Sequence, residues 1–142
     1  MREIKFRGLS LNSEWYYGLL AHSQGKGDQP PKGYYICNSI GMPWAYGIRP
    51  ETIGQFTGLK DKNGIEIYEG DIVKIYATGE KIEEADSFRV YFAEDFLEYR
   101  LEGINNIMDT EFFDMLKFNL DVIGNIHDNP ELLEEPDENP KR

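Results

Sequence analysis

The chain has 142 residues, enough for one domain or for one domain with a small appendage. Its apolar fraction of 40%, with 13% aromatic residues, can form a core, which excludes a chain that is disordered throughout. Residues 1–70 carry eight Lys/Arg and seven Asp/Glu, whereas residues 71–142 carry seven and nineteen, within a total charge of −11. An acidic half repels phosphate backbones, so nucleic-acid binding is disfavoured, and solubility or a basic partner explains the charge better.

Three features indicate a cytoplasmic protein. No run of about 18 apolar residues, the length that spans a membrane, occurs in the sequence. The opening MREIKFRGLSLNSEW lacks the charged-then-apolar layout of a secretory signal. The single cysteine, Cys37, excludes an internal disulfide and suits a reducing compartment. We therefore expect no membrane partner.

The first third of the chain predicts strands and turns. Ile4 and Phe6 alternate with basic residues, and LSLNSE supplies a turn before the next strand. In that strand Trp15, Tyr17 and Leu19 would share one face, because strand side chains alternate. The predicted segments are a hairpin over 4–20, a glycine- and proline-rich loop over 23–33, a strand over 34–40 and a broken segment over 41–50.

The central stretch, residues 52–76, is dense with turn signals. The strand-like TIGQFTGL leads into DKNG, whose Asn63-Gly64 dipeptide readily takes the positive φ angles of a tight hairpin. Ile65 and Ile67 then alternate with polar residues, so we expect both to pack inward. EGD makes a second turn before the strand IVKIY. Turns about ten residues apart are typical of a small barrel or sandwich rather than of βαβ units.

Beyond an exposed connection over 77–87, the sequence predicts another strand. Residues 88–92 would place Phe88, Val90 and Phe92 on one side. A later strand, over 120–126, would do the same for Leu120, Val122 and Ile126.

Two short helices are also predicted in this half. Asp109 or Thr110 would cap a helix near 110–117, whose Phe112, Phe113 and Leu116 lie at three- to four-residue spacing. Asn129 at the cap and Pro130 at the first helical position would start a second helix. The tail after it is polar and proline-broken.

Metal-binding and nucleophilic chemistry has weak support. The only histidines, His22 and His127, stand far apart in the sequence, and a zinc site needs three or four ligands. His127 lies near Asp128 and Glu131, but a helix start explains that spacing without a metal. A lone cysteine in a β-rich run is usually a small core residue, which disfavours a Cys37–His pair. We expect no catalytic residue, cofactor or metal, and the roles of His22, His127 and Cys37 stay open.

Other motifs also fail. DKNG begins like a calcium loop, but the fifth, sixth and twelfth positions counted from Asp61 are Ile, Glu and Ile. The Gly-Lys-Ser/Thr ending of a phosphate-binding loop is absent. Adjacent acids lie in polar company, so we expect them on a solvated surface rather than in acid–base catalysis. These pairs are Glu83-Glu84, Glu94-Asp95 and Glu134-Glu135.

Three blocks of the sequence together resemble the YopX family of phage and prophage proteins. They are REIKFRGL (2–9), TIGQFTGLKDKNGIEIYEGDIV (52–73) and VIGNIHDNPELL (122–133), in the expected order and spanning nearly the whole chain. Residues 77–118 carry no family signature, and His127 stands where many relatives are expected to have tyrosine. The signature residues, which we expect to be structural, are Gly54, Thr57, Gly58, Asp61, Asn63, Gly64, Tyr68, Gly70, Asp71, Gly124, Asn125, Asn129 and Pro130.

The resemblance implies a β-rich fold with an SH3-like barrel, uncharacterised biochemistry, and no catalytic, cofactor or metal residues to carry over. The residues agree, because Gly70 can make the bend and Asp71 can accept backbone N–H groups where a barrel strand begins. We expect a mainly β chain with minor α. Its parts are an N-terminal β-rich portion over 1–50, an SH3-like barrel portion over 51–130 with the short helix near 110–117, and a helix start with an acidic tail over 131–142.

The function that we expect is a non-enzymatic protein-interaction or assembly module in the host cytoplasm, with an unknown protein partner. Edge strands of small β domains often pair across subunits, which favours a homo-oligomer. One alternative is an acidic protein that binds or inhibits a basic host or phage protein, including by mimicry of DNA. A less favoured one is a barrel that binds nucleic acid through aromatic residues and through Lys5, Arg7, Lys60 and Lys62. An enzyme is least favoured.

Overall fold

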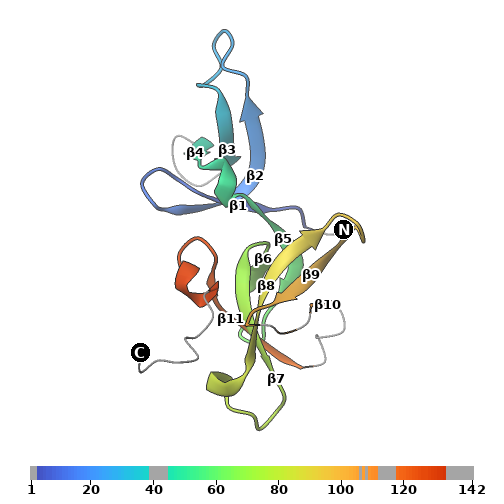
Figure 1. Ribbon diagram of the computed structural model, residues 1–142. Coiled ribbons are helices and arrows are strands. Elements are labelled where there is room, and N and C mark those ends of the chain that lie inside the picture. The colour runs from blue at the N-terminus through green and yellow to red at the C-terminus, as the bar shows by residue number, and fades with distance from the viewer. Residues whose placement is uncertain (1–2, 39–44, 106, 108, 112–117, 134–142) are drawn as a thin grey trace, which may run out of the picture. The chain divides into compact units, whose positions relative to one another are not determined.

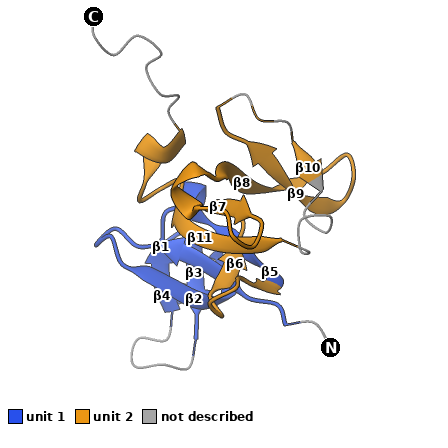
Figure 2. Cartoon of the chain, turned by 90° about the horizontal axis from the view of Figure 1, so that it is seen from below, with its two compact units in different colours: residues 1–58 blue, residues 59–142 orange. Residues whose placement is uncertain are grey.

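The computed structural model describes residues 3–38, 45–105, 107, 109–111 and 118–133 (Figure 1). These residues form mainly antiparallel β-structure, and no helix among them is long and apolar enough to cross a membrane. The chain divides into two compact units, residues 1–58 and residues 59–142, called unit 1 and unit 2 (Figure 2). The three portions expected from the sequence are a finer division and stay a prediction.

Unit 1 is built on one antiparallel sheet with the strand order β4-β3-β2-β1-β5. The opening hairpin is confirmed, because Phe6 pairs with Gly18 and Leu9 with Trp15. A 3-10 turn over Pro50–Thr52 precedes β5, whose last two residues belong to unit 2. The strands are β1 (Phe6–Leu9), β2 (Trp15–Ser23), β3 (Gly33–Cys37), β4 (Ala45–Ile48) and β5 (Gly54–Lys60).

One face of the unit 1 sheet is packed, and part of the other is exposed. Ile36 and Ile48 are buried on the packed face, where a Cβ added to Gly8 would lie 2.3 Å from the Ile48 side chain, whereas buried Leu9 pairs with Trp15 on the other face. The predicted face of β2 is therefore only partly a core face, since Tyr17 and Leu19 are exposed.

Unit 2 holds a five-stranded antiparallel sheet with the order β10-β9-β8-β7-β11. Its core consists of Ile67, Val73, Phe88, Val90, Leu101 and Leu120. Phe88 and Val90 thus share a buried face as predicted, whereas Phe92 lies further along β8 and is exposed. The five strands are β7 (Asp71–Tyr76), β8 (Asp86–Ala93), β9 (Glu98–Gly103), β10 (Thr110–Glu111) and β11 (Asn119–Asn125). Unit 2 also contains β6 (Glu66–Tyr68), which is not a strand of this sheet. A 3-10 turn over Ile82–Glu84 lies in the predicted connection.

The SH3-like barrel is not confirmed. In the part of the chain that the structure describes, β10 and β11 are the two edges of the sheet, which is open rather than closed on itself. A shift of register between Val122 and Gly124 interrupts the pairing of β11 with β7. The coarser expectation, a mainly β chain, is confirmed.

Neither predicted helix is confirmed. Thr110 and Glu111 pair with Leu101 and Arg100 as β10, and residues 112–117 lie outside the described residues. The edge of β9 decides the outcome at Thr110, because it offers backbone partners that local residue spacing does not reveal. The second helix start is a single 3-10 turn, Pro130–Leu133, and residues 134–142 are not described.

The predicted turn over residues 61–64 is confirmed, but the prediction for Ile65 is wrong. Gly64 has a φ of 83°, and its N–H donates to the carbonyl of Asp61 at 3.0 Å, whereas Asn63 keeps a negative φ. Ile67 is fully buried, but Ile65 is 49% exposed. The strand alternation does not reach Ile65, because β6 begins only at Glu66.

Candidate functional site

The carboxylate of Asp61 organises the first signature turn. Its Oδ1 accepts hydrogen bonds from the N–H groups of Asn63 at 2.8 Å and Ile65 at 2.9 Å. Its Oδ2 accepts one from the N–H of Val122 at 3.0 Å, so the same side chain fixes the turn and attaches it to β11. Asp61 is buried and uses both oxygens on backbone groups.

The second signature turn has a similar arrangement. Gly70 has a φ of 92°, donates to the carbonyl of Val90 at 2.8 Å and accepts from the N–H of Ile126 at 2.9 Å. The buried carboxylate of Asp71 accepts the N–H of Tyr68 at 2.7 Å through Oδ2. A glycine is needed here because the turn lies in the left-handed region.

The third signature block folds back on itself after β11. Asn129 Oδ1 accepts the N–H of Asn125 at 3.2 Å, and Asn125 Oδ1 accepts those of His127 and Asp128, both at 2.9 Å. A Cβ at Gly124 would lie 2.4 Å from Asn129 Oδ1. Other signature residues also occupy positions in the strands and turns. Gly54 pairs with Arg7, and half-buried Thr57 lies in β5. Gly58 has a φ of 90°, and Pro130 opens the 3-10 turn.

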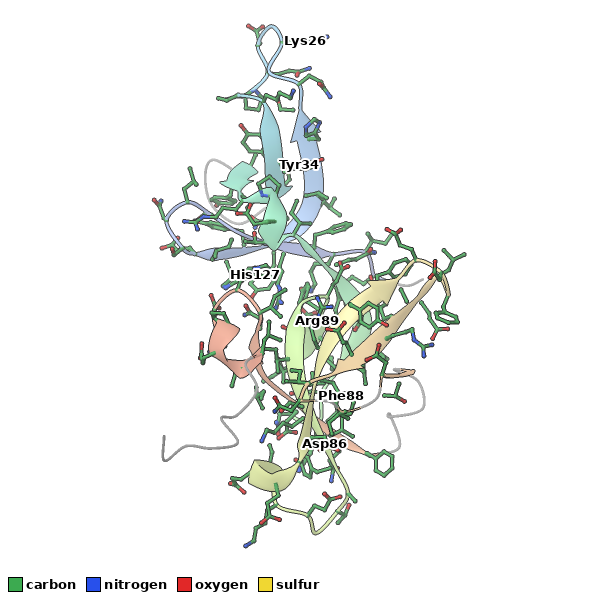
Figure 3. The ribbon with its side chains drawn as sticks, viewed as in Figure 1. Lys26, Tyr34, Asp86, Phe88, Arg89 and His127 are labelled. Carbon is green, nitrogen blue, oxygen red and sulfur yellow. The ribbon has the colours of Figure 1, made fainter. Side chains whose placement is uncertain are left out.

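Within unit 1, His22 and Cys37 do not form a reactive pair. His22 pairs with Tyr34 across β2 and β3, and the centroids of their rings lie 4.5 Å apart. Cys37, three residues after Tyr34 in β3, points to the opposite face of the sheet. His127 belongs to unit 2, in the loop after β11 (Figure 3). Among the described residues, no three His, Cys, Asp or Glu side chains are placed to hold a metal ion.

A polar chain links Lys62, Tyr76 and Asp121 in unit 2. Lys62 Nζ donates to the Tyr76 hydroxyl at 3.0 Å, and that hydroxyl donates to Asp121 Oδ2 at 3.2 Å. The hydrogen bond to Tyr76, with a smaller contribution from Asp121, raises the pKa of Lys62 above 10.5. A lysine that acts as a base or nucleophile near neutral pH needs a lowered pKa. The arrangement therefore suits a link between the signature turn, β7 and β11.

An apolar groove of about 740 Å³ lies in unit 1. Ile4, Leu19 and Cys37 line it, and Leu19 and Cys37 are direct partners across β2 and β3. Ile4 is 58% and Leu19 59% exposed. The remaining lining residues are Glu3, Lys5, Gly18 and Asn38.

Two contacts show how the groove is built. A Cβ at Gly18 would lie 2.3 Å from the Cys37 carbonyl oxygen, so only glycine allows this close approach of β2 and β3. At the rim, Lys5 Nζ lies 3.5 Å from Glu3 Oε2, which pairs the two charges. Cys37 also lines a neighbouring hollow of about 220 Å³ with Ala21.

The groove suits apolar side chains of another protein, since such pockets are mainly apolar with a few polar groups at the edge. Sequence reasoning missed it. Strand alternation predicted that Trp15, Tyr17 and Leu19 share a face, but alternation does not tell a covered face from an uncovered one.

A family model described as YopX protein matches residues 5–134. Among solved structures, the chain is similar to protein EF1440 from Enterococcus faecalis, with a TM-score of 0.54 and 25% sequence identity. That similarity covers 94% of this chain and 100% of the other. No curated protein matches the chain.

Proposed function

The chain belongs to the YopX family, and from this premise we propose that it is a phage or prophage accessory protein acting in the host cytoplasm as a non-enzymatic protein-interaction module. The apolar groove of unit 1 supports the proposal best. Ile4 and Leu19 are both more than half exposed and line one hollow. Fully burying one such side chain is worth about 1.5–3 kcal/mol, so a partner that covers the groove gains affinity from each.

Three observations favour a non-enzymatic role over a catalytic one. Asp61 and Asp71 are buried, and their carboxylates accept hydrogen bonds from backbone N–H groups. These two acids of the signature therefore serve the fold. The raised pKa of Lys62 keeps its amine protonated. Cys37 and His22 lie on opposite faces of their sheet.

The two alternative functions have less support from the same contacts. Mimicry of DNA needs carboxylates presented to a partner, but Glu98 and Glu102 each pair with an arginine at 3.0 Å. Binding of nucleic acid needs available cations. Of the four expected for that role, Lys60 is exposed, whereas Lys5 pairs with Glu3, Arg7 is buried with its guanidinium 4.8 Å from the Trp15 ring, and Lys62 is bonded to Tyr76.

The reactivity of Cys37 measures whether the groove is occupied, because Cys37 is the single cysteine of the chain and lines the groove. Tagged protein is used to capture partners from the bacterial host, and the rate at which a maleimide alkylates Cys37 is measured with and without each captured protein. A partner in the groove slows alkylation by about tenfold or more, since a buried thiol reacts poorly.

The matched variants are Leu19→Lys, in the groove, and Leu11→Lys, at a leucine that is 80% exposed in the turn between β1 and β2. We expect the first to lose the partner and the second to keep it. A partner that leaves Cys37 reactive, or that still binds Leu19→Lys, contradicts the role of the groove. Capture of no partner contradicts the proposed function itself.

Self-association is part of the proposal, because the same apolar face and the strand edges can pair two copies. Sedimentation velocity over a hundredfold range of concentration, centred on about 1 μM, measures it. We expect a concentration-dependent dimer that Leu19→Lys weakens. A monomer throughout the range contradicts the homo-oligomer and leaves the search for another partner unaffected.

A further inference from the structure

The turn between β8 and β9 in unit 2 has features that folding does not explain. Ala93 pairs with Glu98 at the end of the two strands, so residues 94–97 form a four-residue tip (Figure 1). The N–H of Phe96 donates to the carbonyl of Ala93 at 3.2 Å and closes the turn. We call residues 94–97 the β8–β9 tip.

The β8–β9 tip presents two large apolar side chains to solvent. Phe96 is 63% exposed and Leu97 is 79% exposed. Leu97 also has a φ of 54°, in the left-handed region where glycine or asparagine is the usual residue. Its side chain is thus solvated while its backbone is strained, and neither condition favours folding.

The Phe96 ring is nevertheless held in place from one side. The Arg100 guanidinium carbon lies 4.5 Å from the centre of the ring, and Arg100 Nη1 lies 3.0 Å from Glu98 Oε2. Behind the tip, the Phe92 and Tyr99 rings meet edge to face at 5.2 Å. An aromatic side chain that is already positioned loses less entropy when it binds, which favours its use as an anchor.

The charge around the tip defines the chemistry of its partner. Glu94 and Asp95 are exposed within it. Arg100, the first base after the tip, is paired with Glu98 at 3.0 Å, so Glu94 and Asp95 give the tip its net negative charge. Apolar anchors inside a rim of acids complement an apolar pocket inside a rim of bases. A second copy complements the tip less well, since residues 71–142 carry nineteen acids against seven bases.

We propose that the β8–β9 tip is a docking element, which inserts Phe96 and Leu97 into an apolar pocket bordered by Lys and Arg on a protein partner. The inference rests on the proposed function, because it adds a second surface to the same interaction module. It goes further by naming the side chains that anchor the partner and the charge that the partner carries.

A displayed library of random peptides tests this without knowledge of the partner. Peptides are selected on the full-length wild-type protein after depletion on the double variant Phe96→Ser/Leu97→Gly. We expect the enriched peptides to combine apolar residues with Lys or Arg. Their affinity falls by about tenfold or more in the depletion variant, and it weakens with added salt because exposed charges are screened.

Two further variants separate the roles of the tip. Glu94→Gln/Asp95→Asn keeps the apolar anchors, and we expect it to bind the basic peptides less tightly and with less dependence on salt. Leu11→Ser, at an equally exposed leucine in unit 1, leaves their affinity unchanged. Thermal unfolding of each variant, followed by circular dichroism, shows that it is folded.

The remaining outcomes overturn the proposal in distinguishable ways. Enrichment of neutral or acidic peptides contradicts the basic rim. Peptides that bind wild type and the Phe96→Ser/Leu97→Gly variant equally contradict the tip but leave the interaction module standing. Association of the protein with itself that the tip variant abolishes assigns the tip to a second copy. A library that yields no binder to any surface contradicts the tip and also weakens the proposed function.

Discussion

The carboxylate of Asp61 accepts a hydrogen bond from the N–H of Val122 at 3.0 Å, across 61 residues of sequence. The other oxygen of the same carboxylate holds Asn63 and Ile65 in the turn. The backbone of Lys62 adds a second link, since its N–H donates to the carbonyl of Leu120 at 3.1 Å. The central signature block and β11 are therefore joined through one buried acid, which explains an aspartate there without any ligand.

Replacing Asp61 with Asn tests this link. The amide oxygen can still accept from the turn, but the amide nitrogen then faces the N–H of Val122 and leaves that donor without its partner. We expect a loss of about 1–3 kcal/mol in the free energy of unfolding, measured by urea denaturation, and faster hydrogen exchange at Val122. The exposed loop substitution Asp28→Asn is the control and should stay within about 0.5 kcal/mol. Equal stability of the two variants would contradict the assigned role.

Gly124 and Asn129 provide a second test, because a Cβ at Gly124 would lie 2.4 Å from Asn129 Oδ1. We expect Gly124→Ala to destabilise unit 2 by about 1–3 kcal/mol, the usual cost of overpacking. The same change in an Asn129→Ala background should cost less, since the obstructing oxygen is gone, although Leu132 Cδ1 at 3.2 Å remains. A double-mutant cycle measures this coupling.

The control for that cycle is Gly47→Ala, where the added Cβ would lie 3.7 Å from Tyr35, an ordinary contact. It should be tolerated. Strictly additive effects of Gly124→Ala and Asn129→Ala would show that the two residues do not interact.

Much of the fold was readable from local chemistry. The opening hairpin, the turn at Gly64 and the bend at Gly70 follow from alternation and from the φ angles that glycine permits, and each is confirmed. Two predictions failed for different reasons. Thr110 pairs with β9, a partner that local spacing does not reveal, instead of capping a helix. Ile65 lies just before β6, so the alternation of that strand does not apply to it.

The candidate sites were harder to read. Ile4, Leu19 and Cys37 come from three segments, and only the pairing of β2 with β3 shows that the last two meet. At the β8–β9 tip, Glu94-Asp95 was visible only as an acidic pair. The sequence feature that could have indicated the tip is Phe96-Leu97, a large apolar pair that directly follows these two acids. Only the structure shows that both side chains are exposed and that Leu97 has a positive φ.

The link from Lys62 to Tyr76 predicts a dependence of stability on alkaline pH. Folding raises the pKa of Lys62 above 10.5, so its contribution is complete below that pH and is lost as the pH rises through the folded-state value. We therefore expect stability to fall more steeply above about pH 10.5 in wild type than in Lys62→Gln. Urea unfolding at a series of alkaline pH values measures the difference. Lys60→Gln should follow wild type, and parallel curves for Lys62→Gln would refute the link.

Leu97→Gly should make the protein more stable while it weakens docking. At a φ of 54° a leucine backbone is strained by about 1–2 kcal/mol, and glycine removes that strain at the cost of a more flexible unfolded chain. We expect a net gain of about 0.5–1 kcal/mol, or a rise of a few degrees in the melting temperature. Ser13→Gly, at a φ of 62° in the turn between β1 and β2, should gain similarly without changing the affinity of peptides selected on the tip. If Leu97→Gly instead lowers stability, the Leu97 side chain contributes to folding, and its exposure no longer argues for a partner. A gain in stability together with a loss of affinity is the trade expected when a side chain is retained for binding.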